Sequence, residues 1–594
     1  MGTMPAEQVR ASRPLWLVFF VLFLVAAGLG AWGLAELTRP ADQCPPPAAQ
    51  PCGYTPTDIV YFDAQLFLLG SEPLQNGGPF PLPLEVARFL APVATAYGVA
   101  ASVWDTLADR HRRRAARRAR GHAIIIGDDP FAVTLAHNLR SAGTPTVLVT
   151  ADRDADRTAG LVVVGDVRDP AVLRAAGLPQ AATVYACLAD SAANAAVVAA
   201  VATLTGQAQT APTDAHDHPE PLVCYARIAD SELALALKAR RVGLSTASEF
   251  RLDFFTPEEI AARKLAARIL EPHLGSHDGV PSVAIVGLGP FGRALVVELA
   301  RLWRVRSGGP PLPLLLVEMD ASSQLTDLRR RYRLIDEKCV PRARDESSAT
   351  VDLGTIPNGF EPAAAPGARH LVLCDQSEET GLRRALNTTR SAADVGQTVT
   401  VCLGQRTALG DLLHPRLLDP GPGQVRIFAI VNEAAEPDEL RNDTLTVLAR
   451  AIHGQYLIAE QEKGTAIGSS ESMELWDGLP EDLRTANYRQ ATGIGAKLNE
   501  INAVVVPMTY PTTGFTFHPD EIDLLARIEH ERWCAERRSQ GWTFAPIRDN
   551  ARKRHNLLVN WTELPSEHRA KDTATIRNLP DLLADHGLQI LRLH

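Results

Sequence analysis

Residues 14–35 form an uncharged, strongly apolar run of 22 residues that is flanked by charged residues. A helix of this length rises about 30 Å, which matches the hydrocarbon thickness of a bilayer. A cleaved signal peptide is the alternative, but its apolar region is usually about 7–15 residues long and ends in small residues. Because Trp32 and Glu36 stand where cleavage would occur, we expect a transmembrane helix over 14–37 after a cytoplasmic terminus, 1–13.

The remaining chain has the composition of ordinary globular domains, with 46% hydrophobic and 22% charged residues overall. Its 594 residues suffice for three or four domains, and the net charge of −9 argues against a nucleic-acid-binding protein. Six of the eight cysteines are scattered through apparent strands and helices, which is typical of a reducing cytosol. The other two, Cys44 and Cys52, lie close together and could form a disulfide in an oxidising compartment.

A second apolar run, 89–104, is rich in Ala and Gly and contains Pro92. Such small residues suit a helix that packs against other helices, although an amphipathic helix on the membrane surface is the alternative. Seven arginines follow within 110–120, whereas the segment 37–84 contains only one. Because Lys and Arg accumulate on the cytoplasmic side, we predict a second span over 85–107.

These two spans predict a multi-pass protein of the cell (plasma) membrane with both termini in the cytoplasm. The segment 38–84 then forms an extracytoplasmic loop, and 108–121 forms a basic linker to the cytosolic region. The arginines of this linker could also contact anionic lipid headgroups.

The two-span layout resembles the pore unit of potassium channels. Residues 57–71 (TDIVYFDAQLFLLGS) are similar to the pore helix that precedes a selectivity filter in that family. A potassium filter needs a run of backbone carbonyls, usually TVGYG, whereas the corresponding place reads LLGSEP and contains Gly70 and Ser71. The resemblance therefore implies a channel-like part whose filter is lost, or a relic that serves only as an anchor.

The cytosolic region contains two similar strand–turn–helix–strand patterns. The first covers 122–152, and the second begins at 282–303 and continues at 312–320 after a Gly- and Pro-rich insertion. Continuous apolar runs on either side of a helix indicate a parallel sheet that is covered on both faces. We predict two Rossmann-like α/β modules, over 122–275 and 280–455.

The second module has the complete G-x-G-x-x-G turn of a dinucleotide-binding site. Its glycines allow the tight turn, the close approach of a pyrophosphate and the helix–strand packing, and an acid at the end of the next strand can bind ribose hydroxyls. The alternative is a glycine turn kept only for packing. We predict NAD(H) or an adenine nucleotide as ligand, and the candidate residues are Gly287, Gly289, Pro290, Phe291, Gly292, Glu318 and Asp320.

The corresponding turn of the first module has lost part of this pattern. It reads GDDPFA, in which Gly127 remains but Asp129 and Ala132 replace two glycines. Carboxylates at the amino end of a helix occupy the place of a phosphate and repel it. We therefore expect no dinucleotide in the first module.

Further segments resemble the regulatory RCK (TrkA-N) domains that control potassium channels and transporters. They are VVVGDVRDPAVLRAAGL (162–178), RLDFFTPEEIAARKLAARIL (251–270) and, in the second module, LVLCDQSEETGLRRAL (371–386). The resemblance implies domains that pair and assemble into rings, bind nicotinamide or adenine nucleotides or ions, and pass a conformational change to the membrane part. It also implies a homo-oligomer, either a tetramer or a dimer of dimers.

The carboxyl-terminal region, 521–594, closely resembles the ryanodine-receptor repeat (RyR domain), through H-x-x-W, GW, KRH and W-x-x-L-P elements in this order. In a small-ligand pocket, tryptophans can stack on the ligand and basic side chains can bind phosphate. The alternative is that the tryptophans are core residues and the basic run is a solvated loop. The candidate pocket residues are His530, Trp533, Trp542, Arg548, Lys553 and Arg554.

The preceding segment echoes this region. Residues 448–456 parallel 525–533, and 476–487 parallel 561–572, which suggests tandem repeats. We assign 456–520 to a degenerate RyR-like segment or linker, although the start of the echo also fits the closing helix of the second module.

The predicted fold class is thus an α-helical membrane hairpin, two α/β Rossmann-like modules and a mostly α-helical RyR domain. The first functional hypothesis is a channel-like membrane protein regulated by nucleotide-sensing domains. The second is a non-conducting, membrane-anchored nucleotide sensor that signals to a partner. The third is a membrane-bound NAD-dependent oxidoreductase, but the sequence has no evident substrate domain with an acid–base residue, so we expect no enzyme and assign no catalytic or metal residue.

Overall fold

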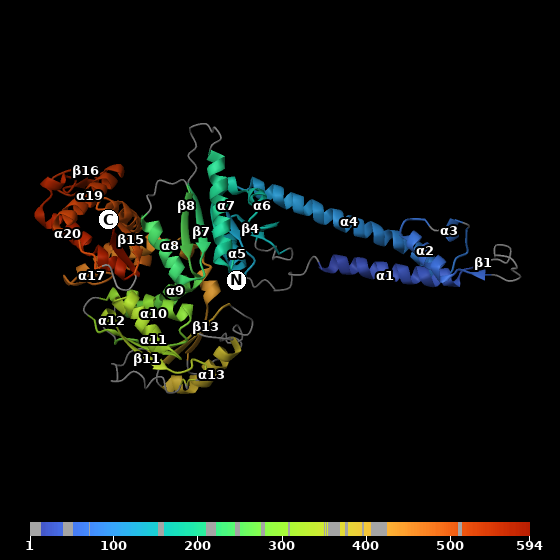
Figure 1. Cartoon of the computed structure of the whole chain (residues 1–594), viewed down its shortest axis with the longest axis horizontal. Coiled ribbons are helices and arrows are strands. Elements are labelled where there is room, and N and C mark those ends of the chain that lie inside the picture. The colour runs from blue at the N-terminus through green and yellow to red at the C-terminus, as the bar shows by residue number, and fades with distance from the viewer. Residues whose placement is uncertain are drawn as a thin grey trace. The chain divides into compact units, whose positions relative to one another are not determined.

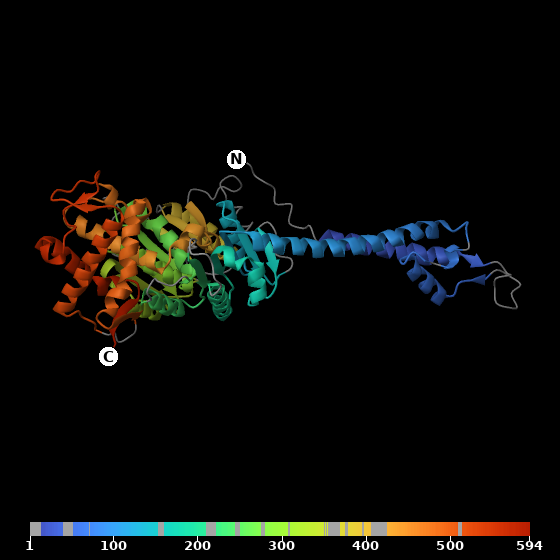
Figure 2. The same cartoon turned by 90° about the horizontal axis from the view of Figure 1, so that it is seen from above.

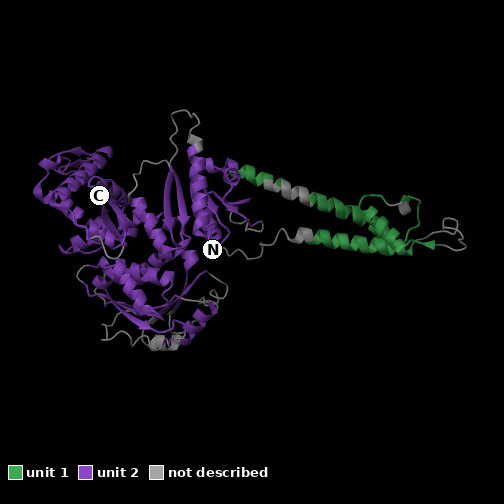
Figure 3. Ribbon diagram, in the orientation of Figure 1, with its two compact units in different colours: residues 1–116 green, residues 117–594 purple. Residues whose placement is uncertain are grey.

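The structure is a computed structural model of the chain (Figure 1). It describes residues 13–39, 52–70, 72–75, 77–152, 160–209, 221–243, 250–274, 279–306, 309–349, 351, 353, 369–374, 378–394, 397–405, 424–508 and 514–593. The chain divides into two compact units, Met1–Ala116 and Arg117–His594 (Figure 3). The division falls inside the basic segment that the sequence predicts as a linker.

The first unit contains α1 (Arg13–Glu36), α2 (Pro56–Leu66), α3 (Glu72–Gln75), α4 (Leu82–Arg118) except for its last two residues, and a short antiparallel pair of β1 (Thr38–Arg39) and β2 (Cys52–Gly53). Within the described residues, Leu17–Glu36 is the one helix that is long and apolar enough to cross a membrane. Helix α4 includes the predicted second span and continues to Arg118, so most of the predicted linker is helical. Its Ala- and Arg-rich sequence favours this, because both residues have high helix propensity.

Glycines bring α1 and α4 into close contact. A Cβ at Gly33 would lie 2.4 Å from the main-chain nitrogen of Leu84, and one at Gly98 would lie 2.6 Å from the Phe19 ring. Small residues at such places let two helices approach closely, as in pairs of membrane helices. The two helices run side by side in both views (Figures 1 and 2).

Helix α2 corresponds to the pore-helix-like segment. Thr55 and Asp58 form a capping box at its amino end, which satisfies the first main-chain N–H groups. After the helix the chain passes through Leu69, whose φ is +61°, to Gly70. The side chains of Leu68 and Leu69 are 81% and 83% exposed within the chain.

Two predicted positions in this unit, Ser71 and Cys44, lie outside the described residues. Cys52, which the sequence pairs with Cys44, is disulfide-bonded. Its pairing with Cys44 stays a prediction.

The second unit begins with module 1, whose described residues form a six-stranded parallel sheet. Its elements are β3 (His122–Ile126), α5 (Pro130–Ser141), β4 (Thr146–Thr150), β5 (Leu161–Val164), α6 (Pro170–Ala175), η3 (Leu178–Gln180), β6 (Ala181–Ala186), α7 (Ser191–Gln209), β7 (Leu222–Arg227), α8 (Ser231–Gly243), β8 (Phe250–Phe255) and α9 (Pro257–Leu274). The strand order is β5-β4-β3-β6-β7-β8. This is the doubly wound order of a Rossmann fold.

Module 2 repeats this order as β11-β10-β9-β12-β13-β14, again with parallel neighbours. Alternate residues of its first strand enter different hydrophobic clusters, Val283 and Ile285 one, Ala284 and Val286 the other, so the sheet is covered on both faces. The predicted α/β class is therefore confirmed. The elements are β9 (Ser282–Val286), α10 (Pro290–Arg304), β10 (Leu312–Glu318), α11 (Ala321–Arg331), α12 (Leu334–Lys338), β11 (Cys339–Asp345), β12 (Arg369–Leu373), α13 (Glu378–Asp394), β13 (Gln397–Leu403), β14 (Gln424–Ala429), α15 (Ile430–Ala434) and α16 (Pro437–Arg441).

The two modules share one hydrophobic core, in which α9 packs against α10. Helix α15 of module 2 also lies on module 1. Asn138 of α5 donates a hydrogen bond to the Ala435 carbonyl at 3.0 Å, and Lys264 of α9 pairs with Glu433 at 2.9 Å. The modules are therefore joined by a continuous apolar interface with polar contacts at its edge.

The chain from Thr444 onward contains α17 (Thr444–Gln461), η5 (Glu471–Met473), η6 (Trp476–Gly478), α18 (Glu481–Asn499), β15 (Ala503–Pro507), α19 (Pro519–Ser539), β16 (Thr543–Phe544), β17 (Arg554–His555), η7 (Trp561–Glu563), α20 (Ser566–Arg577), α21 (Leu579–Ala584) and β18 (Leu588–Arg592). Strands β15 and β18 pair antiparallel. Helix α17 packs mainly on α18. The boundary of module 2 at 455 stays a prediction.

The sequence echo in this region corresponds to one packing arrangement that occurs twice. His453 of α17 donates to a main-chain carbonyl at 2.7 Å, and its ring centroid lies 6.2 Å from that of Trp476. His530 of α19 donates to a main-chain carbonyl at 2.9 Å, and its ring centroid lies 5.9 Å from that of Trp561. In each case the tryptophan begins a short 3-10 turn that precedes the next helix.

A buried carboxylate joins module 1 to α17. Asp253 of β8 is 4% exposed and accepts hydrogen bonds from the Thr444 main-chain N–H at 2.8 Å and hydroxyl at 2.7 Å. Asp443 caps the same helix end by accepting from the N–H of Thr446. Burial, and next the charge of Asp443, raise the pKa of Asp253 to about 6.

We expect this junction to weaken as the pH rises. The pKa of Asp253 is about 6 in the folded chain and 3.8 for an ordinary aspartate, so the folded state binds the proton more tightly. Its contribution to the free energy of unfolding is therefore largest below pH 3.8 and declines as the pH rises to about 6. When thermal unfolding is measured across this pH range, the thermal midpoint should fall less for Asp253→Asn than for the unchanged chain. The exposed-site control Asp523→Asn should show the same dependence of the midpoint on pH as the unchanged chain. The same dependence in Asp253→Asn would contradict the role given to Asp253.

The contact between α1 and α4 is testable by substitution. In Gly33→Ala the new methyl group collides with the main chain of Leu84, and overpacking of this kind costs about 1–3 kcal/mol. Gly28→Ala is the matched control, because a Cβ at that position has nothing within 4 Å and Ala is the better helix former. In detergent, Gly33→Ala should lower the thermal midpoint of the full chain and Gly28→Ala should not. Equal midpoints would show that the helices do not meet at Gly33.

Candidate functional site

The glycine turn of module 2 connects β9 to α10. Gly287 has a φ of +98°, a left-handed value that glycine adopts without strain. A Cβ at Gly292 would lie 2.2 Å from the Gly287 carbonyl oxygen, so no side chain fits there. At Gly289, which caps α10, a Cβ would have nothing within 4 Å. Packing therefore requires two of the glycines, and the third leaves open space beside the first N–H groups of the helix, where phosphates bind in other proteins.

The two residues between Gly289 and Gly292 serve the helix and the core. Pro290 takes the first position of α10, where its fixed φ suits a helix start. Phe291 is 4% exposed, and its ring centroid lies 5.9 Å from that of Phe428. Phe291 therefore supports the turn from the core.

Glu318 lies against the same turn. It ends β10, which neighbours β9, and its carboxylate accepts hydrogen bonds from the N–H groups of Leu288 at 3.3 Å and Met319 at 3.0 Å. A half-exposed acid at this place can also accept hydrogen bonds from ribose hydroxyls. Asp320 is exposed and accepts a hydrogen bond from the Gln324 side chain at 2.8 Å, so it lies at the rim.

Sequence reasoning missed the last residue of β11 and the loop after it, which complete this end of the sheet. Asp345 accepts hydrogen bonds from the N–H and hydroxyl of Ser322 at 2.7 and 2.6 Å, and these bonds lower the pKa of Asp345. Ser348 donates to Glu318 at 3.4 Å, and Arg384 of α13 donates to the Ser348 carbonyl. The available signal was position, because ligands of open α/β sheets bind at the carboxyl ends of the strands.

Asp129 of module 1 stands where Gly289 stands in module 2. One carboxylate oxygen accepts a hydrogen bond from the N–H of Ala132 at 2.9 Å and so caps α5. The other oxygen pairs with Arg227 at the end of β7, and that guanidinium also lies 5.6 Å from the centre of the Phe131 ring. A charge pair of the protein itself therefore fills the phosphate position. The sequence pointed to the acid but not to its partner, which lies 98 residues away.

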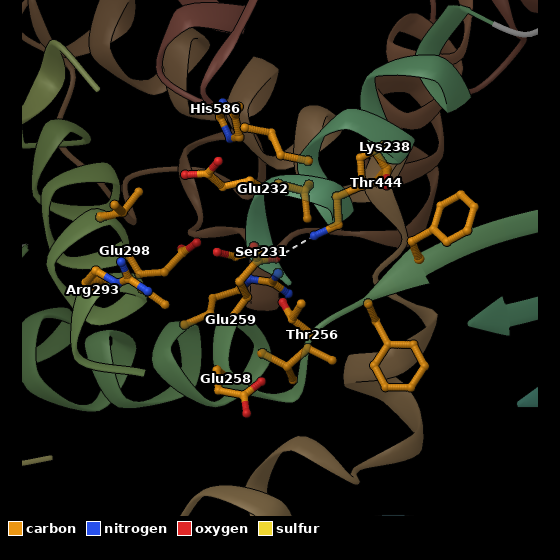
Figure 4. Close-up of a pocket in the computed structure, with 18 of the residues that line it drawn as sticks. Ser231, Glu232, Lys238, Thr256, Glu258, Glu259, Arg293, Glu298, Thr444 and His586 are labelled. Atoms are coloured by element: carbon orange, nitrogen blue, oxygen red, sulfur yellow. Dashed lines mark hydrogen bonds and ion pairs between the residues drawn. The ribbon is translucent and has the colours of Figure 1, made fainter. Parts of the chain in front are cut away.

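A cavity of about 830 Å³ lies between the two modules and the RyR region (Figure 4). Its walls come from α8, β8 and α9 of module 1, from α10 and α11 of module 2, and from the turn before β18. Lys238 pairs with Glu259, and Arg301 pairs with Glu298 at 2.6 Å. His586 lines the cavity from the RyR region, and burial lowers the pKa of this histidine well below its usual value. Opposite charges meet along these walls, so the cavity favours no one ligand charge.

His530 is a core residue of the RyR region. It is 4% exposed, and its Nε2 donates a hydrogen bond to the Val559 carbonyl at 2.9 Å. The Sγ of Cys534 lies 3.4 Å from the same nitrogen. Because that nitrogen carries the proton that it donates, it cannot deprotonate the thiol, and burial raises the pKa of Cys534. The two residues therefore do not form an activated nucleophile.

Trp533 and Trp542 come together around His555. The His555 ring centroid lies 5.0 Å from that of Trp533 and 5.9 Å from that of Trp542. The guanidinium of Arg537 lies 5.9 and 5.4 Å from the centres of the same two rings, within cation–π range. His555 and Arg537 of the chain itself, which the sequence did not point to, thus lie next to both tryptophans.

The three basic candidates lie after α19. Lys553 donates to the Gln540 carbonyl at 2.9 Å and so caps the end of that helix. Arg548 donates to the side chain of Asn550 at 2.8 Å, and Arg554 is exposed in β17. The small-ligand pocket at these residues stays a prediction.

Comparison with solved structures finds channel chains of low similarity. A structure titled GsuK Channel has 18% identity, covers 73% of this chain and 100% of its own, and gives a TM-score of 0.34. The GsuK bound to ADP has 17% identity and covers 73% of this chain and 98% of its own, with a TM-score of 0.34. The GsuK channel bound to NAD has 15% identity and covers 74% of this chain and 86% of its own, also at 0.34.

Two domain families match parts of the sequence. The TrkA-N domain matches residues 123–227, which lie in module 1 and end at Arg227. The RyR domain matches residues 518–592, which run from the residue before α19 to the end of β18. The chain therefore combines a TrkA-N domain with a RyR domain.

Proposed function

We propose that this chain is a membrane protein in which a nucleotide bound by module 2 regulates a channel-like membrane part. The observation that carries the proposal is the contrast between the two turns. The turn of module 2 is open at Gly289, whereas Asp129 fills the corresponding place in module 1. The TrkA-N match of module 1 and the same strand order in module 2 support a pair of regulatory Rossmann domains. One nucleotide, NAD(H) or an adenine nucleotide, binds per chain.

The proposed binding uses three parts of module 2. The pyrophosphate lies beside Gly289 and accepts hydrogen bonds from the first N–H groups of α10. Glu318 accepts hydrogen bonds from the ribose hydroxyls. The side chain of Met319, which is 65% exposed beside Glu318, covers the adenine ring. Binding shifts the membrane part only if the nucleotide has different affinity for its two states.

In the membrane, we propose two spans formed by α1 and the first part of α4, with both termini in the cytoplasm. The apolar helix Leu17–Glu36 supports the first span, and the glycine contacts support a helix hairpin. The arginines near the end of α4 support the orientation. Copies assemble in the plasma membrane as a tetramer or a dimer of dimers, and the sequence LLGSEP in place of TVGYG makes strong selectivity for potassium over sodium unexpected.

The RyR domain provides a second place for a ligand. Trp542 is half-buried, and Arg548 and Arg554, which follow it in the chain, are exposed. An aromatic ring with nearby guanidinium groups suits a ligand that carries both a ring and a phosphate.

The missing filter favours a second candidate, a non-conducting membrane-anchored nucleotide sensor that signals to a partner. Leu68 and Leu69 stand beside Gly70 where filter carbonyls would be, and both are highly exposed within the chain. We propose sensing rather than hydride transfer in either case, because the sequence contains no evident substrate domain with an acid–base residue.

Nucleotide binding should depend on Gly289. Gly289→Val places a branched side chain in the open space of the turn, which blocks the pyrophosphate but touches nothing within the chain, so the variant should fold and lose NAD or ADP binding in titration calorimetry. Asp129→Asn in module 1 is the control and should bind normally. Gly292→Ala should instead lower the thermal midpoint, since its Cβ would lie 2.2 Å from the Gly287 oxygen. Unaltered affinity in Gly289→Val would reject the site.

Ion flux into proteoliposomes separates the two functional candidates. For the channel-like protein, NAD or ADP should change the flux through the reconstituted full chain, with similar rates for potassium and sodium. Gly289→Val should keep a basal flux that no longer responds to nucleotide. Nucleotide binding without any flux would favour the non-conducting sensor, and strong potassium selectivity would contradict the lost filter.

A further inference from the structure

A three-residue turn of the RyR region, Asp585–Gly587, reaches both Rossmann modules. It connects α21 to β18. Gly587 has a φ of +70°, and a Cβ on it would lie 2.9 Å from the Tyr332 ring and 3.1 Å from the Leu235 side chain. Leu235 lies on α8 of module 1, and Tyr332 directly follows α11 of module 2. The turn thus fits between the two modules with no room for one additional methyl group.

Polar contacts tie the same turn to α10. The Nε of Arg301 donates to the Asp585 carbonyl at 3.0 Å, and Arg304 pairs with the Asp585 carboxylate. Both arginines lie in the second half of the helix whose first residues follow the open glycine turn. His586, between the two contacts, lines the cavity that the modules share (Figure 4).

We propose that the Asp585–Gly587 turn is a wedge through which the RyR domain sets the spacing of the two Rossmann modules. Well-packed interfaces change between discrete arrangements rather than deform continuously, because their side chains interlock. A movement of the RyR domain that withdraws the turn removes its contacts with α8 and with the residue after α11. It also releases the arginines at the end of α10 from Asp585. The RyR domain therefore acts on the interface that joins the modules, a link that goes beyond the proposed nucleotide site.

The test is hydrogen–deuterium exchange on the full chain without nucleotide. In Gly587→Ala the methyl group meets Tyr332 and Leu235, so exchange in α8 and α10 should rise by roughly tenfold or more. Gly541→Ala is the matched control, because Gly541 also lies in the RyR domain with a φ of +84°, but its Cβ meets only Lys553 at 4.0 Å. Its effect should stay within the RyR domain. Equal exchange of α8 and α10 in the two variants would overturn the proposal.

A second variant covers the case in which Gly587→Ala does not fold. Asp585→Ala removes the carboxylate that pairs with Arg304 and leaves the main chain unchanged. Exchange in α10 and α8 should rise while α19 of the RyR domain stays protected, and the exposed-site control Glu563→Ala should resemble the unchanged chain. Unaltered exchange of α10 and α8 in Asp585→Ala would equally overturn the proposal. This readout uses neither nucleotide nor ions, so its result is independent of the proposed function.

Discussion

The packing of α10 against α9 is the interaction on which the rest of the second unit depends. Helix α10 buries Leu295, Leu299 and Trp303 in the core that both modules share. Burial of large apolar side chains is the main stabilising term in such an interface. Because the helix is fixed along this face, its amino end is held at the glycine turn and its other end at Asp585 of the RyR region. One helix thus connects the candidate nucleotide site, the joint between the modules and the carboxyl-terminal domain.

The two Rossmann modules show how a single side chain changes what a fold can bind. Both have the same strand order and a glycine with positive φ after the first strand, Gly127 and Gly287. In module 1 a carboxylate and a guanidinium satisfy the helix end, and in module 2 the helix end is left open. A helix amino terminus favours negative charge, and that charge can come from a ligand or from the chain itself. In module 1 that charge comes from the chain itself, through Asp129.

Buried charge pairs join α18 of the upstream segment to α19 of the RyR domain. Lys497 of α18 and Glu529 of α19 are 4% and 6% exposed and pair at 2.6 Å. Arg532 binds the same glutamate at 2.7 Å. A buried pair adds little stability over an apolar contact, but the loss of one partner leaves an uncompensated charge and is strongly destabilising. The pair therefore fixes how the upstream segment meets the RyR domain, and it links the two occurrences of the His–Trp arrangement.

The sequence by itself determined the features that local patterns carry. An uncharged apolar run specifies α1, alternating apolar runs and helices specify two parallel sheets, and glycine spacing specifies the turn at Gly287, because each depends on residues that are close in the chain. Even there the pattern could not separate a ligand role from a packing role. Phe291 stands inside the motif, yet the structure shows it in the core.

Only the tertiary structure decided which distant side chains meet. Arg227 reaches Asp129 across 98 residues, and Asp585 meets Arg301 across 284. Such pairs leave no periodic signal in the sequence, because they depend on how whole elements pack rather than on spacing within one element. For the same reason, the filled turn of module 1 could be half predicted from its acid, whereas the wedge at Gly587 could not be predicted at all.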